Sequence, residues 1–179
     1  GNKALEKNTV LNAPAIGLLA SMGIEYISVY AIPKVALIIT GNEIQPVGTI
    51  LIDGKVYDSN SFTLNAALKS IGVQALSIHY VIDDLNKLMH TLENTSKEHD
   101  IIIMTGGVSV GDYDLVAKAC ADLGVQTIFH KIKQKPGKPM FFGINGKIPI
   151  LGLPGNPASA LTCFYEYVTE ALAIQTKRP

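Results

Sequence analysis

Residues Asp100 to Asp114 read D-I-I-I-M-T-G-G-V-S-V-G-D-Y-D, a stretch that joins three predicted elements of structure. The apolar run Ile101–Met104 is largely β-branched and has no helical period, which is typical of a strand buried on both faces. The glycines and small hydroxyl residues of Thr105–Gly111 allow sharp turns and bare backbone N–H groups. Asp114 is the predicted N-cap of a helix over Leu115–Leu123. A strand, a glycine loop and a helix N-terminus in this order favour binding of an anionic group.

Predicted strands and helices alternate on both sides of this stretch. The predicted strands are Tyr26–Tyr30, Lys34–Ile39, Val73–Tyr80, Gln126–Ile132, Met140–Ile144 and Ile148–Gly152. The predicted helices run from Asn12 to Met22, from an Asn60 cap to Ile71, from Asp83 to about Thr95, and from Ala158 to Ile174. Residues 47–58 are expected to form a loop or a hairpin, and Asn145-Gly146 is a strong hairpin signal.

This order of elements predicts an α/β protein of three layers, α/β/α, with a doubly wound, mostly parallel sheet and a C-terminal hairpin. We expect residues 1–33 to form a lead-in helix and a short strand, and residues 34–179 to form the α/β domain. The chain begins with Gly1 rather than Met, which suggests a trimmed tag or an excised piece of something longer.

Composition excludes several classes of protein. The 179 residues carry 15 basic and 15 acidic side chains, so we expect neither nucleic acid nor an anionic membrane as a partner. No apolar run approaches the roughly 18 residues of a membrane span. The four histidines lack paired ligand spacing, which argues against zinc. We interpret Cys120 and Cys163 as buried free thiols in a reducing cytoplasm.

Acidic residues recur just after predicted strands. They are Glu43, Asp83, Asp84, Asp112 and Asp114. Any one of them is more simply a helix cap or a solvated side chain. In a doubly wound sheet, however, the loops after parallel strands meet at one edge. Carboxylates gathered there favour a cation or a ligand rich in hydrogen-bond donors.

Four lysines without an intervening acid follow a later predicted strand, at Lys131, Lys133, Lys135 and Lys138. They could simply protect an edge strand from pairing. Alternation would place the first three on one face, and the sequence P-G-K-P would stiffen the turn after them. Such a loop suits phosphate or another oxyanion.

Gly107–Gly111 also fits the G-x-S-x-G pattern of a hydrolase nucleophile, and Ser109, Asp114 and His130 follow in the expected order. Those hydrolases need a longer chain, with the acid and the histidine on much later strands, so we disfavour an esterase. The Thr105 and Ser109 hydroxyls more simply hydrogen-bond a ligand or their own loop. No P-loop and no dinucleotide fingerprint occurs.

Five motifs in order resemble the molybdopterin molybdotransferase family, of the gephyrin E-domain type. They are T-G-N-E-I at residues 40–44, Asp83-Asp84, G-G-V-S-V-G-D-Y-D at 106–114, K-P-G-K-P at 135–139 and L-P-G-N-P-A-S-A at 153–160. The sister adenylyltransferase branch shares the glycine motif but not, as a rule, the last two. The resemblance covers nearly the whole chain.

The resemblance implies that the chain binds adenylylated molybdopterin and molybdate, inserts molybdenum with Mg²⁺ and releases AMP. It implies catalytic and metal-binding roles for Glu43, Asp83 and Asp114. The cofactor-binding residues that we predict are Thr40, Gly41, Thr105, Gly106, Gly107, Ser109, Gly111, Lys131, Lys135, Gly137, Lys138, Pro154, Gly155 and Asn156.

The chain departs from the family at two positions. Asn42 stands where the family usually has Asp, and Ile82 where an Arg is common. Full-length members also carry further domains on both sides and complete the active site across a dimer, so the resemblance implies a homo-oligomer, a dimer or a trimer. Two alternatives stay open: a molybdopterin-binding module without activity, and a molybdopterin adenylyltransferase.

Overall fold

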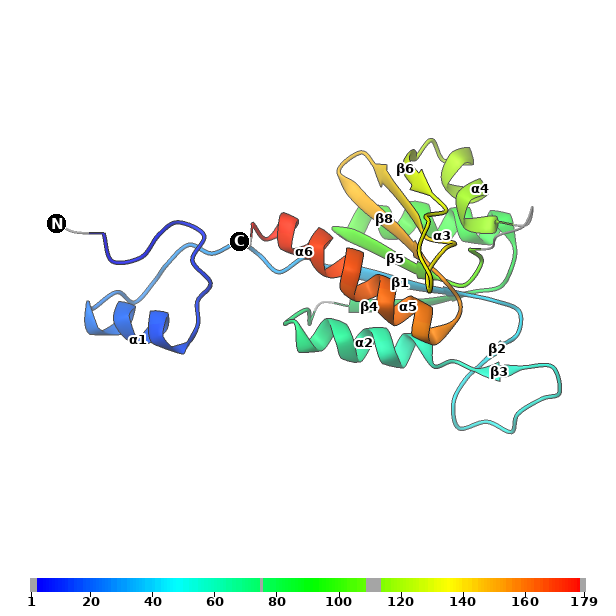
Figure 1. Ribbon diagram of the computed structural model, residues 1–179, viewed down its shortest axis with the longest axis horizontal. Coiled ribbons are helices and arrows are strands. Elements are labelled where there is room, and N and C mark those ends of the chain that lie inside the picture. Colours follow the sequence, from blue (N-terminus) through cyan, green and yellow to red (C-terminus); the bar gives the residue numbers. More distant parts are fainter. Residues whose placement is uncertain (1–2, 75, 109–113, 178–179) are drawn as a thin grey trace.

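The computed structural model describes residues 3–74, 76–108 and 114–177, and a six-stranded sheet lies at its centre (Figure 1). The strand order is β4-β1-β5-β8-β7-β6. β4, β1, β5 and β8 pair in parallel, while β7 lies antiparallel between β8 and β6. The bounds are β1 Val35–Thr40, β4 Leu76–Val81, β5 Ile101–Thr105, β6 Gln126–His130, β7 Phe141–Asn145 and β8 Ile148–Leu153. The mostly parallel sheet and its C-terminal hairpin, β7–β8, are confirmed.

Helices cover both faces of this sheet. Alternate residues of β1 divide between two cores: Val35, Leu37 and Ile39 pack with one pair of helices, and Ala36 and Ile38 with the other. The first core holds α2 (Asn60–Ser70) and α5 (Pro157–Cys163), with the π-helical η1 (Phe164–Val168) and α6 (Thr169–Gln175) that continue α5. The second holds α3 (Leu85–Glu98) and α4 (Leu115–Asp122). This period of two along each strand produces the predicted three layers.

The chain order places a topological switch point beside β1. From β1 the chain crosses to β4 on one side and then returns to β5 on the other. Ile39 pairs with Thr105, so the carboxyl ends of β1 and β5 lie next to each other. Loops that leave two neighbouring strands in opposite directions open a crevice between them, where ligands of such folds bind.

The predicted strand Tyr26–Tyr30 is wrong. Residues 24–34 of the described chain form no helix or strand, and Tyr26 is 84% exposed. Together with α1 (Ala13–Ser21), which Asn12 caps, this segment extends to one side of the sheet (Figure 1). The aromatic and β-branched residues of Y-I-S-V-Y suit a strand, but a strand also needs a partner for its backbone groups, and the described chain supplies none here.

Other predicted elements need smaller corrections. Of the two structures expected for residues 47–58, the chain forms a loop and not a hairpin. The loop covers residues 46–55, and the short strands on either side of it, β2 (Ile44–Gln45) and β3 (Val56–Tyr57), pair in parallel. Asn60 is the first residue of α2 and not its cap; Asp58 accepts the Ser61 N–H instead, at 3.0 Å. The last helix contains the π-helical turn η1, which the apolar pattern does not reveal.

No helix in the described part of the chain combines the length and apolarity needed to cross a bilayer. Both cysteines are free and buried, as predicted. Burial raises the pKa of the Cys120 thiol to about 12, so this thiol is held in its protonated form.

Two histidines share one serine hydroxyl at the amino edge of the sheet. The Thr95 carbonyl lies 3.0 Å from His99 Nδ1, and because a carbonyl only accepts, Nδ1 carries the proton. His99 Nε2 therefore accepts from Ser77 Oγ at 2.7 Å, and Ser77 Oγ accepts from His79 Nε2 at 2.9 Å. Burial, with a smaller effect from His99, lowers the pKa of His79 below its usual value.

This lowered pKa predicts a loss of stability in acid. The unfolded chain takes up the His79 proton more readily than the folded chain, so the contribution of His79 is present above about pH 6.5 and is lost as the pH falls below it. We expect the free energy of unfolding to fall less steeply between about pH 7 and pH 5 in His79→Gln than in the wild type. Urea denaturation across this range measures both slopes. The exposed His90 provides the control, and a His79→Gln slope equal to that of His90→Gln contradicts the prediction.

Candidate functional site

A cavity of about 280 Å³ lies at the carboxyl ends of β1 and β5. Residues from separate sequence motifs line it, and five of them are predicted site residues: Thr40, Glu43, Thr105, Gly106 and Gly155. The cavity also includes the first residues of α2, among them Asn60. The structure thus brings together side chains that are up to 115 positions apart in the sequence, from Thr40 to Gly155, at the crevice that the topology predicts.

Glycine is required where these loops meet. Gly106 has a φ of +83°, and a Cβ atom added there would lie 1.8 Å from the Thr40 carbonyl oxygen. A Cβ on Gly107 would lie 2.8 Å from Thr40 Cγ2. A Cβ on Gly155 would lie 3.7 Å from Gly106 Cα, so the loop after β8 passes close to the loop after β5. The small residues of these motifs therefore allow three strand ends to share one cavity.

Asp83 fastens the loop after β1. Its Oδ1 accepts the Thr40 hydroxyl at 3.0 Å, and its Oδ2 accepts the Asn42 backbone N–H at 3.1 Å. In return, Asn42 Oδ1 accepts the Asp83 backbone N–H at 3.1 Å. Asn42, one of the two residues that depart from the family pattern, therefore joins the loop after β1 to the loop after β4 through reciprocal hydrogen bonds with Asp83.

Asp114 caps α4 as predicted and also pairs with a histidine. Its Oδ1 accepts the Ala117 backbone N–H at 3.0 Å. Its Oδ2 lies 2.8 Å from Nε2 of His130, at the end of β6, and the Asp114 side chain is only 8% exposed. Asp114 and His130, the acid and the histidine of the hydrolase pattern that we disfavoured, are therefore in contact. Its serine, Ser109, lies outside the described residues, as does the predicted ligand contact Gly111.

The three predicted metal-binding carboxylates do not fit a preassembled magnesium site. Asp83 and Asp114 each accept hydrogen bonds at both of their oxygens. Among residues 3–74, 76–108 and 114–177, no three or more His, Cys, Asp or Glu side chains gather as they would around a metal ion. Glu43 lies at the cavity, while Asp83 and Asp114 do not line it. Metal binding by these three residues stays a prediction.

The lysines lie on a loop and not on one face of a strand, because β6 ends at His130. Lys131, Lys133, Lys135 and Lys138 are all exposed. The loop closes on β7 through Lys131 N–H to Met140 O at 2.9 Å. Gln134 anchors it to η1, since its Oε1 accepts the Tyr167 hydroxyl at 2.5 Å. Gly137 lies so close to α5 that an added Cβ would be 2.6 Å from Cys163 Sγ.

The loop between β8 and α5 is held by its own polar groups. Asn156 caps α5, and its Oδ1 accepts the Ser159 N–H at 3.2 Å. The Pro154 carbonyl accepts the Thr105 hydroxyl at 3.1 Å. The contacts of Pro154 and Asn156 are thus structural ones, while Gly155 between them borders the cavity.

Sequence reasoning missed Asn60 as a residue of the site. Its Nδ2 donates to Thr105 Oγ1 at 2.9 Å and to the Gly155 carbonyl at 2.8 Å. We expected only a helix cap here. The signal that could have identified it is its place at a helix start on the carboxyl side of the sheet, where Asp84 and Asp114 also lie.

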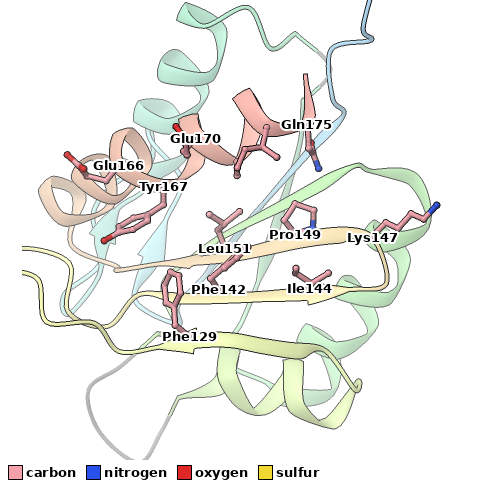
Figure 2. A pocket seen from close by; sticks show the side chains of 12 residues that line it. Phe129, Phe142, Ile144, Lys147, Pro149, Leu151, Glu166, Tyr167, Glu170 and Gln175 are labelled. Atoms are coloured by element: carbon pink, nitrogen blue, oxygen red, sulfur yellow. The ribbon is translucent and has the colours of Figure 1, made fainter. Parts of the chain in front are cut away.

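A larger cavity, of about 380 Å³, lies between the β7–β8 hairpin and α6 (Figure 2). Its floor is formed by apolar side chains such as Phe129, Phe142 and Leu151, with Glu166 and Lys147 toward opposite ends. Of the predicted site residues that the structure describes, none lines it. An apolar groove is a poor receptor for a phosphorylated ligand, so the smaller cavity is the candidate site.

Comparison with known proteins identifies the family of the chain. A family described as a probable molybdopterin-binding domain matches residues 36–174. A molybdopterin molybdenumtransferase from Nostoc is 37% identical over 171 residues, which are 94% of this chain and 39% of the relative. One from Synechocystis is 33% identical over 176 residues, 97% of this chain and 45% of the relative. The chain therefore spans less than half the length of these curated relatives.

Solved structures show the same fold. A molybdopterin biosynthesis MoeA protein from Pyrococcus horikosii is 33% identical, with a TM-score of 0.83, over 97% of this chain and 43% of that chain. The Mog protein from Mycobacterium ulcerans, at 20% identity and a TM-score of 0.57, matches over 79% of this chain and 98% of its own. At that identity the second likeness concerns the fold alone.

Proposed function

Because this chain belongs to the molybdopterin-binding domain family, we propose that it binds adenylylated molybdopterin and, as part of a longer molybdopterin molybdotransferase, inserts molybdenum and releases AMP. The observation that carries this proposal is the cavity at the ends of β1 and β5, where residues from separate motifs line one space. We propose that the pterin ring of the ligand enters this cavity and that its phosphate groups contact the exposed lysines of the loop after β6.

The lysine loop supports the anionic part of this assignment. Lys131, Lys135 and Lys138 are exposed cations on a loop that Gln134 and Gly137 hold against the last helix. Phosphate and molybdate are dianions, for which ammonium groups on a stiffened loop are suitable partners. In the proposed reaction water cleaves the phosphoanhydride, so that one P–O bond breaks, and AMP and the molybdopterin phosphate leave as separate monoesters.

We propose that AMP release requires Mg²⁺, and the dependence of AMP release on Mg²⁺ concentration tests this requirement. Asp83 and Asp114 are engaged by protein donors at both oxygens, so we assign no step to a metal held by them. Asp83 is proposed to hold the loop after β1 in place. The charge of Asp114, which is paired with His130, is proposed to be needed for turnover. Glu43, at the cavity, is the acid that we propose to contact the ligand.

The specific alternative is a module that binds molybdopterin without turning it over. One observation favours it: among the described residues, the predicted carboxylates do not gather into a metal site. Incubation with adenylylated molybdopterin, molybdate and Mg²⁺ separates the two functions, with AMP release as the readout. Binding without AMP release identifies the module, and the absence of binding contradicts both functions. Consumption of ATP with unmodified molybdopterin would instead indicate the adenylyltransferase.

Lys135→Ala tests the proposed anion loop. We expect its affinity for adenylylated molybdopterin to fall by about 10-fold, because a charge-assisted contact to phosphate or molybdate is lost. Isothermal titration measures the affinity. Lys147→Ala, which removes an equally exposed lysine from the β7–β8 turn, is expected to bind like the wild type. An unchanged affinity in Lys135→Ala removes this lysine from the site.

Three further proposals concern the whole protein. We propose a homo-oligomer, a dimer or a trimer, as the family resemblance implies. We propose the cytoplasm as its compartment, which two buried free thiols support. We also propose that residues 34–179 are the molybdopterin-binding unit and residues 1–33 a separate lead-in.

A further inference from the structure

We infer that Tyr167, on the π-helical turn η1, is a positioning residue. Through Gln134, its hydroxyl holds the lysine loop, residues 131–139, so that Lys135 is placed to contact an anion. This inference rests on the proposed binding of adenylylated molybdopterin and adds a residue outside all five sequence motifs. Tyr167 does not line the cavity at the ends of β1 and β5, so its role is to act on the loop and not on the ligand.

The backbone of the lysine loop is closed at its base. The Lys131 N–H donates to the Met140 carbonyl and the Ile132 N–H donates to the Lys138 carbonyl, both at 2.9 Å. Lys131 has a φ of +63°, in the left-handed region that residues with a Cβ atom disfavour. The loop therefore begins with a strained residue, and the positions between Ile132 and Lys138 need further contacts to keep their place.

The side chain of Gln134 supplies such contacts at both ends of its amide. Nε2 lies 2.9 Å from the Pro136 carbonyl, which can only accept a hydrogen bond, so the amide nitrogen faces the loop. Oε1 is then the end that faces the last helix, where it accepts the Tyr167 hydroxyl at 2.5 Å. Gln134 stands between Lys133 and Lys135, so a bond to its side chain fixes the backbone that carries both lysines.

The Tyr167 ring is itself held in place. Its centroid lies 6.0 Å from that of Phe129, on the strand that leads into the lysine loop, and both rings line the larger cavity (Figure 2). Cys163, four residues before Tyr167, lies against Gly137 of the same loop. Burial raises the pKa of Tyr167 above its usual value, so the hydroxyl remains a donor at neutral pH. π-helical turns are rare and recur at functional sites, which agrees with a role for η1 beyond packing.

Tyr167→Phe tests this inference, because it removes the hydroxyl and keeps the ring against Phe129. We expect the affinity for adenylylated molybdopterin to fall by about 5-fold, since Lys135 is no longer held in place. Isothermal titration measures the affinity. Tyr165→Phe is the matched control: Tyr165 lies on the same turn, is 55% exposed and should bind like the wild type without its hydroxyl. An unchanged affinity in Tyr167→Phe overturns the inference.

The double variant Tyr167→Phe/Lys135→Ala separates positioning from a purely structural role. If the hydroxyl acts through Lys135, the double variant binds less than about 2-fold more weakly than Lys135→Ala alone, because the effects of residues that act through one another do not add. If Tyr167 only supports the fold, its loss of about 5-fold returns in full in the double variant. That result overturns the inference.

Trypsin tests the position of the loop without any ligand. The bond between Lys133 and Gln134 is cut readily only when this part of the loop leaves the last helix. We expect cleavage after Lys133, identified by mass spectrometry, to be about 5-fold faster in Tyr167→Phe than in the wild type or Tyr165→Phe. Equal rates overturn the inference.

Two further outcomes are decisive. If Tyr167→Phe does not fold, as judged by thermal unfolding, Gln134→Met takes its place and breaks the same hydrogen bond from the side of the loop. A wild type that does not bind adenylylated molybdopterin contradicts the proposed function, and the trypsin rates still decide whether Tyr167 holds the loop. A wild type that binds while Tyr167→Phe is cleaved and binds like it leaves the proposed function standing and overturns the role of Tyr167.

Discussion

Gly106→Ala is expected to lower the free energy of unfolding by more than about 4 kcal/mol, an unusually large effect for one methyl group. Two costs add at this position. The backbone has a φ of +83°, a left-handed conformation that an L side chain disfavours by about 1–2 kcal/mol. The new Cβ would also lie 1.8 Å from the Thr40 carbonyl oxygen, so the loop after β5 must move away from β1.

Gly124→Ala separates these two costs. Gly124 has a similar φ of +72° at the end of α4, but nothing lies within 4 Å of a Cβ added there. It should lose only the conformational part, about 1–2 kcal/mol. Urea denaturation followed by circular dichroism gives both free energies. Equal losses in the two variants would mean that the contact between Gly106 and β1 does not constrain the fold.

Asp114→Asn is expected to reduce AMP release by at least about 100-fold while leaving the fold intact. Asparagine is as good a helix cap as aspartate, so its Oδ1 can still accept the Ala117 N–H and keep α4 in place. What the substitution removes is the negative charge that lies 2.8 Å from His130 Nε2, on a side chain only 8% exposed. Because the change is nearly isosteric, a loss of turnover reports on this charge and not on packing.

The measurement is AMP release from adenylylated molybdopterin, with thermal unfolding as the check on the fold. Asp122→Asn is the control, since Asp122 lies on the same helix and forms an exposed ion pair with Lys118 at 3.2 Å. Exposed pairs contribute little, so this variant should turn over and unfold like the wild type. Turnover within twofold of the wild type in Asp114→Asn removes this residue from the catalytic role.

Much of the fold follows from local sequence pattern. The β-branched runs at residues 35–39 and 101–104 predict buried strands, and both are completely buried. Asp114 is predicted as a helix cap and caps its helix. These features depend on residues within a few positions of one another, so they can be identified without knowledge of distant partners.

Contacts between distant segments could not be predicted in the same way. The strand expected at Tyr26–Tyr30 has suitable residues but finds no partner within the described chain, and the lysine alternation fails because β6 ends at His130. The reciprocal bonds between Asn42 and Asp83, and the pairing of Asp114 with His130, depend on how four separate loops pack. Recurrence of acids after strands indicates a shared edge of the sheet, but not which oxygens remain available to a ligand.

The sequence by itself determined the class of fold and the edge of the sheet at which a site would form. Side-chain period and cap chemistry are local, and parallel strands place their following loops at one end. Only the tertiary structure decided which of those residues line the cavity, because that depends on the close approach of Gly106 and Gly155 to β1. The same packing pairs both oxygens of Asp83 and of Asp114 with protein donors.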